Sequence, residues 1–486
     1  MRNMFKRVMA LLLALAMVLS LAACGEQVDE TDAPKNDTTE APASNDGTQA
    51  PSGETEAPDD GALDTSWIIE EDTSISGKVN FWTAFKGSAG MDAMIAEFNE
   101  IYPNIEVVLT PYSNNSDGNL GVNTALTSGE IDVLVSFGVS HLFNRAETGL
   151  LMDITDKCAE EGIDLVEQWN FDCYKYEDAI YSFPCGGLSY YVAINMDMWN
   201  EAGLGELPTE WTWDEYLEAC KAMHKVAADG TIEVYGGSDY HSYNYWMYAN
   251  AQEYGGDVYY SPDGTPSYDE PLLLQALERK LKAELEDELW YPCYRYRADN
   301  IQAQMTFCQG EVASVVIPNV VRFLHDTETY PDVDWITGFA PYPTEYEGQE
   351  NHMAGVAPFS HAGMAANCQD EDAAWAFLKW YSTYGVKYLV AAGHQPGWNG
   401  TEAGAAVEII YGSVEEAEKW IDVESYNRVV GNPNLPSYAE TNLLAYTEIT
   451  GVLKDPTMQA INGELTAKEA LDIMIKEAEA VYEAAK

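Results

Sequence analysis

Side chains that could bind a small ligand follow three short apolar runs in the first third of the chain. They are Trp82 and Lys86 after the first run, Tyr112 after the second, and Ser136 with Phe137 after the third. Aromatic rings offer flat apolar faces, while lysine and serine side chains offer hydrogen bonds. This combination suits a ligand that has both apolar faces and polar groups, so we predict a binding site here.

Alternating strand and helix patterns must bring these side chains together. The expected strands are 79–81, 105–109 and 131–135. Between the first two, apolar residues recur every three or four positions, as on one face of a helix: Met91, Met94, Ile95, Phe98 and Ile101. Pro103 ends that helix because proline cannot donate a backbone hydrogen bond. Strand, helix and strand in this order predict a parallel sheet, and ligands bind outside the carboxyl ends of such strands.

Motifs for catalysis are scarce. The seven histidines form no H-E-x-x-H motif, and the chain has no G-x-S-x-G nucleophile elbow and no glycine-rich phosphate loop. No metal-ligand motif appears, and we expect no cofactor. With 80 acidic residues, a glycosidase-type pair of carboxylates could arise by chance, so the sequence leaves a glycosidase open as an alternative.

Length and charge limit the function classes further. A chain of 486 residues is too long for one ordinary hydrophobic core, which predicts two packed lobes. The formal net charge of -55 argues against nucleic acid as a partner, because phosphate binding needs clustered Lys and Arg. The acid excess is typical of a solvated, self-repelling surface.

The first residues are typical of an export signal. Arg2, Lys6 and Arg7 precede a short apolar run, which ends at Leu21-Ala22-Ala23-Cys24. Small residues before a cysteine resemble a bacterial lipoprotein signal, which implies a signal peptide over 1–23 and lipid on Cys24. An ordinary secretory signal with an unrelated cysteine is the alternative.

The segment 24–75 is expected to be a disordered acidic linker. It is rich in Glu, Asp, Thr, Pro and Ser, and Lys35 is its only basic residue. Such a segment cannot bury enough apolar surface to offset its chain entropy, apart from possible order near Trp67. Seven further cysteines lack any C-x-x-C spacing, which indicates buried thiols rather than a zinc or redox motif, with one disulfide left open.

Several motifs occur together in an order that resembles one family. They are FWTAF, EFNEIYPNIEV, SGEIDVLV, TGLLMDIT, AIYSFP, YYVAINMDMWNEAGL, PTEWTWDEYLEACKAM, FCQGEVASVVIPN, GFAPYP, DEDAAWAFLKWYS and HQPGW. In this order they resemble the family 1 extracellular solute-binding proteins, the sugar-binding components of bacterial ABC importers that include maltose-binding protein. The resemblance covers roughly 77–486.

The resemblance implies an α/β fold of the two-lobed periplasmic-binding-protein type (type II). Each lobe is expected to be a mostly parallel sheet flanked by helices, with the ligand in the cleft between the lobes. The implied N-terminal lobe is 76–192 with 340–395, and the C-terminal lobe is 193–339 with 396–486. A strand over 188–194 is expected to carry the first crossing between them. Capping boxes predict helices that start after Thr212 and after Thr466.

The resemblance also implies which residues bind. Trp82, Lys86, Ser136 and Phe137 match the family's ligand loops. In the second lobe, the segment 238–246 with Asp239, Tyr240 and Trp246 would form a sugar wall. Asn319, after the strand 315–317, and Trp398, beside the last hinge, would face the cleft, and Tyr438 is a further candidate. Core packing is the alternative for Trp82, and a position inside a helix is the alternative for Trp246. Pyranose rings pack their C–H faces on aromatic planes, and the chain has 13 Trp and 31 Tyr. The chain departs from maltose-binding protein at most of these positions, so the identity of the sugar does not carry over.

The function implied is that of a monomeric, lipid-anchored receptor at the extracellular face of the bacterial cytoplasmic membrane. It would capture a sugar or oligosaccharide and deliver it to the permease subunits of an ABC importer, without catalysis. Two alternatives stay open: the same fold binding a peptide, polyamine or organic acid, and the extracellular glycosidase.

Overall fold

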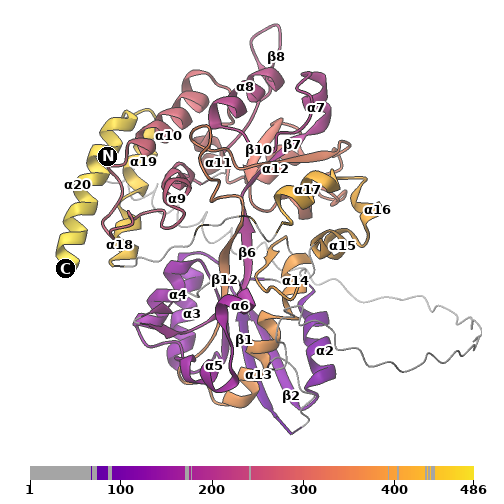
Figure 1. Ribbon diagram of the computed structural model, residues 1–486, viewed down its shortest axis with the longest axis vertical. Coiled ribbons are helices and arrows are strands. Elements are labelled where there is room, and N and C mark those ends of the chain that lie inside the picture. The colour runs from indigo at the N-terminus through magenta and orange to yellow at the C-terminus, as the bar shows by residue number, and fades with distance from the viewer. Residues whose placement is uncertain are drawn as a thin grey trace, which may run out of the picture. The chain divides into compact units, whose positions relative to one another are not determined.

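The computed structural model (Figure 1) divides the chain into two units, Met1–Asp60 and Gly61–Lys486. It describes residues 67, 74–85, 90–169, 175–176, 178–239, 242–391, 393–401, 404–432, 435, 438 and 444–486, which all belong to the second unit. The predicted signal peptide, the lipidation site Cys24 and most of the predicted linker lie outside these residues.

A six-stranded sheet forms around the first three predicted strands, in the order β13-β6-β12-β3-β1-β2. Its strands are β1 Gly77–Thr83, β2 Ile105–Pro111, β3 Val133–Phe137, β6 Phe183–Ser189, β12 Val356–Met364 and β13 Gln395–Pro396. β1 pairs parallel with β2 and β3, as predicted, whereas β12 pairs antiparallel with both β3 and β6. The carboxyl ends of β1, β2 and β3 therefore meet at one edge.

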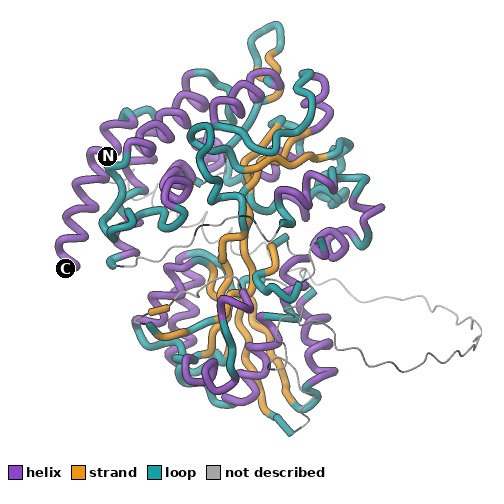
Figure 2. Tube along the Cα trace, viewed as in Figure 1, coloured by secondary structure: helices purple, strands orange, loops and turns teal. Residues whose placement is uncertain are grey.

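Helices cover this sheet, and Figure 2 shows them along both sides of its strands. They are α2 Met91–Ile101, α3 Ser116–Ser128, α4 Val139–Glu147, α5 Thr155–Glu161, α6 Leu165–Trp169, α13 Glu371–Ser382 and α14 Val386–Ala391, with the small hairpin β4 Lys175–Tyr176 and β5 Ala179–Ile180. Met91, Met94 and Phe98 are buried on the predicted face of α2. These elements form the first core cluster.

A second sheet places β7 Tyr191–Asn195 between β10 Ser314–Ile317 and β11 Thr337–Pro341, antiparallel to both. All five residues of β7 are buried, because apolar side chains cover both faces of this sheet. Val192 and Ile194 belong to the second core cluster, while Tyr191 and Ala193 belong to a third. This alternation follows the two-residue period of a strand.

The remaining elements surround the second sheet. They are α7 Met196–Glu201, α8 Trp213–Met223, β8 Lys225–Val226, β9 Ile232–Val234, η2 Tyr245–Met247, α9 Tyr248–Tyr254, α10 Pro271–Leu281, η3 Lys282–Glu286, α11 Cys293–Ala298, α12 Ala303–Cys308, η4 Val320–Phe323, α15 Ala405–Tyr411, α16 Val414–Ala417, α17 Val423–Val429, α18 Tyr446–Gly451, α19 Lys454–Ile461 and α20 Ala467–Ala485. Both predicted capping boxes are present, at Thr212 with Glu215 and at Thr466 with Glu469.

The crossings between the clusters differ in detail from the expected ones. The stretch 188–194 is not one strand: Ser189 ends β6 and pairs with Val356, whereas Tyr191 starts β7 and pairs with Ile317. Met353 still packs in the second cluster and Trp398 in the first. On packing grounds, we therefore propose that the second lobe extends to Met353 and that the first includes Trp398.

Trp67, which falls within the predicted linker, packs in the first core cluster. Its side chain is only 8% exposed, and its ring centroid lies 5.9 Å from that of Trp169 and 6.3 Å from that of Phe183. Its carbonyl accepts a hydrogen bond of 3.0 Å from Lys379 Nζ. The folded body therefore reaches back at least to Trp67, because this indole completes the first core cluster.

Candidate functional site

The carboxyl ends of β1, β2 and β3 bring four predicted site residues to one edge, although Trp82 lies within β1, and Ser136 and Phe137 are the last two residues of β3, because both strands extend beyond their predicted ends. Trp82 is aligned with Thr110 of β2 and Leu134 of β3, so Tyr112 and Ser136 each follow two positions later. Trp82 is half-buried against the first core cluster, while the side chains of Tyr112, Ser136 and Phe137 are buried. This is the edge at which the sequence predicts a ligand.

Arg145 lies beneath this edge and joins two of the four. Its Nη1 donates a 2.7 Å hydrogen bond to Ser136 Oγ, Nη2 donates one of 2.7 Å to Asn119 Oδ1, and Nε donates one of 2.9 Å to Asn123 Oδ1. Arg145 also interacts with the Tyr112 hydroxyl, which donates to Val135 O. Burial lowers the pKa of Arg145 to about 10, so the guanidinium stays charged at neutral pH.

Aromatic rings continue from this edge toward the crossing strands. Phe137 lies 5.1 Å from Phe85 and 6.0 Å from Phe359, centroid to centroid. His394 packs against both Phe85 and Phe359, and burial, with the nearby Arg322, lowers its pKa to about 3. Phe359 of β12 packs against both the first and the second core cluster. It is one of the residues that join the two sides, and the sequence argument did not select it.

On the second side, Asp239 and Asn319 occupy equivalent positions. The segment 235–238 runs beside β10, with Tyr235 bridged in parallel to Val312 and Val316 N donating to Ser238 O. Asp239 and Asn319 therefore follow the carboxyl ends of two neighbouring parallel segments. Asp239 is buried and its Oδ2 lies 3.2 Å from Lys280 Nζ.

A cluster of tyrosines surrounds the predicted site residue Tyr438. The Tyr438 hydroxyl donates to the Tyr248 hydroxyl at 3.4 Å, and the two rings lie 5.4 Å apart. Tyr190 lies 5.2 Å from Tyr248 and 5.6 Å from Tyr245. Tyr190 occupies the crossing between β6 and β7. The sequence argument did not select Tyr190 or Tyr248, because their Tyr-rich segments also fit ordinary core packing.

The other predicted residues are buried or lie outside the described chain. Trp246 is 4% exposed within η2, in the second core cluster. Trp398 is 6% exposed, and its Nε1 donates to Gln168 Oε1 at 3.0 Å. Lys86 and Tyr240 lie outside the described residues. The roles of all these residues in binding stay predictions.

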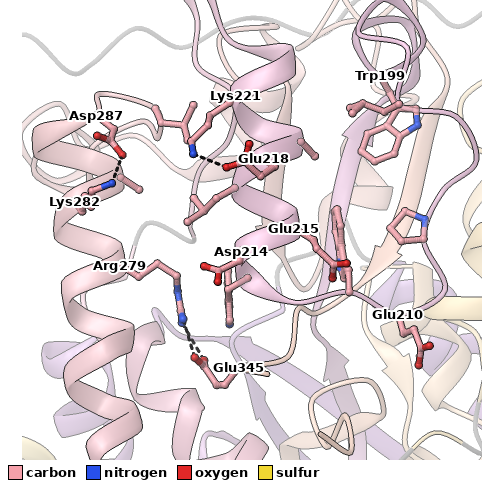
Figure 3. Close-up of a pocket in the computed structure, with 18 of the residues that line it drawn as sticks. Trp199, Glu210, Asp214, Glu215, Glu218, Lys221, Arg279, Lys282, Asp287 and Glu345 are labelled. Atoms are coloured by element: carbon pink, nitrogen blue, oxygen red, sulfur yellow. Dashed lines mark hydrogen bonds and ion pairs between the residues drawn. The ribbon is translucent and has the colours of Figure 1, made fainter. Parts of the chain in front are cut away.

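A hollow of about 830 Å³ lies between α8 and α10, and it contains none of the predicted site residues (Figure 3). Its charged lining is largely paired: Arg279 makes two contacts with Glu345, of 2.7 and 2.9 Å, and Lys221 pairs with Glu218. The Arg279 guanidinium also lies 4.5 Å from the Trp213 ring centroid. The hollow is lined in part by residues of the second core cluster, such as Trp211 and Trp213, and by none of the four residues at the edge of the first sheet.

Other site classes find no support in the described part of the chain. No group of three or more His, Cys, Asp and Glu within it could hold a metal ion. Five of the six cysteines that it includes are buried, in agreement with the predicted buried thiols. None of its helices has the length and apolar character needed to cross a membrane.

Comparison with known proteins gives the family. The model for "Bacterial extracellular solute-binding protein" matches residues 84–388. Among curated proteins, the maltotriose-binding protein of Pyrococcus abyssi is 24% identical over 313 residues, which cover 63% of this chain and 63% of that protein. The match thus spans less than two thirds of that relative.

Solved structures agree on the fold. An ABC substrate-binding protein from Listeria monocytogenes in complex with cycloalternan aligns with a TM-score of 0.66 at 17% identity, covering 84% of this chain and 99% of that one. UgpB from Mycobacterium tuberculosis, in complex with glycerophosphocholine, gives a TM-score of 0.65 at 16% identity with the same coverage. The predicted two-lobed α/β fold is confirmed. From the family match over most of the folded body, we conclude that this chain belongs to the bacterial extracellular solute-binding protein family.

Proposed function

We propose that this protein captures a sugar or oligosaccharide outside the cell and delivers it to an ABC importer. The observation that carries the proposal is the set of aromatic and polar side chains at the carboxyl ends of β1, β2 and β3. It lies next to Phe359, which also packs against the tyrosine-containing second cluster. The names of the Pyrococcus and Listeria proteins, which state maltotriose and cycloalternan, support the same solute class.

The chemistry of this edge suits a sugar. A pyranose ring would lay a C–H face on Trp82 and on the tyrosine cluster of Tyr190, Tyr248 and Tyr438, while its hydroxyls would bond to polar groups at the same edge. A solute that contacts Trp82 on the first lobe and the tyrosine cluster on the second would bind the closed form of the protein better than the open form. It would then shift the population toward the closed form.

Export and anchoring complete the proposal. The chain would be cleaved before Cys24, carry lipid on that cysteine, and remain as a monomer at the extracellular face of the cytoplasmic membrane. There it would hand its solute to the permease subunits without changing it chemically. Replacing Cys24 by Ala should abolish membrane retention, and a variant retained at the wild-type level would exclude the lipid anchor.

Titration calorimetry on the wild-type body tests the solute class. Maltotriose and cycloalternan are the sugar probes, and glycerophosphocholine is the non-sugar probe, because the UgpB complex contains it. We expect a dissociation constant in the micromolar range or below for at least one oligosaccharide, and the sugar should be recovered unchanged by chromatography. Binding of the non-sugar probe alone would favour the non-sugar alternative, and hydrolysis of the sugar would favour the glycosidase.

The half-buried Trp82 supplies the sharper version of this test. Trp82→Ala should weaken oligosaccharide binding at least tenfold, about 1.4 kcal/mol, because stacking on a desolvated ring is lost. Trp420→Ala is the matched control, since Trp420 is a partly buried indole packed against the third core cluster. Equal affinities in both variants would place Trp82 outside the site.

A further inference from the structure

Lys280 is a buried cation on the second side of the protein. It lies in α10, its side chain is 2% exposed, and its Nζ is 2.6 Å from Glu284 Oε1 and 3.2 Å from Asp239 Oδ2. Burial alone would lower the pKa of Lys280, but the two carboxylates more than offset burial and raise it. The ammonium is therefore charged at every physiological pH.

Both oxygens of the Glu284 carboxylate accept hydrogen bonds, which fix the position of this side chain. α10 continues into the π-helical turn η3, and the chain then reverses, with Leu289 N and Trp290 N both donating to Ala283 O. Glu284 Oε2 accepts a 3.0 Å hydrogen bond from Cys293 N, while Oε1 accepts from Lys280. With Glu284 fixed in this way, the Lys280 ammonium has a fixed position too.

Asp239 is the most exposed of the three charged residues, although its side chain is still only 7% exposed. It follows the parallel segment beside β10, directly before the residues 240–241 that lie outside the described chain, and next to the end of β10 that carries Asn319. The cluster holds one cation and two carboxyl groups. A carboxylate has several acceptor positions, so Asp239 can bond to Lys280 and still accept from another donor.

We propose that Lys280 is a positioning residue that orients the Asp239 carboxylate as a hydrogen-bond acceptor for a solute hydroxyl. This inference rests on the proposed sugar-binding function and on Asp239 as part of that site. Glu284 acts one step further back, because it holds Lys280. The Lys280 ammonium, 3.2 Å from Asp239 Oδ2, restrains the Asp239 carboxylate in one orientation. An Asp side chain without such a partner can rotate, so it would be less well oriented for a solute.

A double-mutant cycle on solute affinity tests the proposal, with maltotriose or cycloalternan, whichever binds the wild type. Lys280→Met and Asp239→Asn should each weaken binding about tenfold, and the double variant should bind no more weakly than the worse single one. Arg279→Met is the matched control, because Arg279 precedes Lys280 in α10 and its ion pair is with Glu345 at the hollow. It should lower the melting temperature without changing affinity.

Each outcome supports or overturns the role of Lys280. Lys280→Met with an affinity within twofold of wild type overturns it, as does a double variant whose losses multiply, because the two residues would then act independently. If Lys280→Met does not fold, Glu284→Ala, which removes the acceptor that holds Lys280, must weaken binding, and unchanged affinity in that variant overturns the proposal. Failure of the proposed function looks different, because the wild type itself would then bind neither oligosaccharide.

Discussion

Arg145 and Lys280 are both buried cations beside the predicted site, but their surroundings are opposite. Arg145 is tied to neutral acceptors, the side-chain oxygens of Ser136, Asn119 and Asn123, and no described ion pair includes it. Lys280 lies between two carboxyl groups. A planar guanidinium with five donors can be satisfied by neutral groups in fixed directions, whereas a compact ammonium needs counter-charge when it loses water.

These different surroundings indicate that Arg145 and Lys280 stabilise their parts of the protein in different ways. Arg145 joins α4 to α3 and β3 by geometry, so its contribution should not depend on pH. Lys280 joins α10 to Asp239 by charge, and the cluster carries one more carboxyl group than cations, so its contribution should depend on pH. Three substitutions can break or sharpen this contrast, and the one with the largest expected effect is considered first.

Lys280→Met should cost about 3–5 kcal/mol of unfolding free energy at pH 8, because it leaves two buried carboxyl groups without their cation. The groups around Lys280 are Asp239, Glu284 and Cys293, with Arg297, Tyr216 and Tyr342 also interacting with members of the cluster. Without the cation, the carboxyl pKa values rise in the folded state, so the folded variant binds more protons than the unfolded chain.

The sign of the pH effect follows from that proton uptake. Stability of the variant should rise as pH falls toward the unfolded carboxyl pKa, about 4.3 for Glu. Urea unfolding at pH 8 and pH 5 should therefore show a smaller loss at pH 5, with Arg145→Met, whose hydrogen-bond partners are neutral, as the control. The same loss at both pH values would mean that charge does not dominate this cluster.

Arg145→Met should cost somewhat less, about 2–4 kcal/mol, because it leaves two buried acceptors, on Ser136 and Asn119, and the half-buried Asn123 oxygen without their donor. The loss should be nearly equal at pH 5 and pH 8, since the hydrogen-bonded partners are neutral. Burial lowers the pKa of the neighbouring His141, and the charge of Arg145 lowers it further. The variant loses this second effect, so protonation of His141 adds only a small gain in stability at low pH. The unfolding free energy of Arg145→Lys should lie between those of the wild type and Arg145→Met, because an ammonium cannot reach all three acceptors. A strongly pH-dependent loss would remove the contrast with Lys280.

Glu284→Gln should have the smallest effect, about 1–2 kcal/mol, because the amide oxygen can still accept from Lys280 while the contact with Cys293 N is lost. Burial raises the pKa of Glu284 in the wild type, despite the opposing attraction of Lys280. That group therefore contributes stability at low pH that declines as pH rises through the raised pKa. The deficit of the variant, measured by urea unfolding, should accordingly narrow from pH 5 to pH 8, and a widening deficit would contradict the raised pKa.

Much of the first sheet could be predicted because its signals are local. The period of Met91, Met94 and Phe98 along α2, the proline after it, and the capping boxes at Thr212 and Thr466 each depend on residues within one turn or one helix. The site edge at Trp82, Tyr112 and Ser136 followed from the rule for parallel strands, which needs only the order of the elements.

The two buried cations could have been suspected but not assigned. Arg145 and Lys280 each lie on the apolar face of an amphipathic helix, among Leu142 and Ala146 in α4 and among Ala276 and Leu277 in α10. A lone base on such a face is a signal of an internal hydrogen-bond partner. Which partner it finds is not local information.

The sequence by itself determined that strands and helices alternate in the first part of the chain, that the chain builds two lobes, and which family it resembles, because these depend on local pattern and on the order of motifs. Only the tertiary structure decided that Phe359 packs against both clusters, that Tyr190 meets Tyr438, and that Lys280 is bound by Asp239. Those contacts join residues far apart in the chain, and no local preference specifies them. They form because burial leaves each polar or aromatic group only the partners that the packed fold supplies.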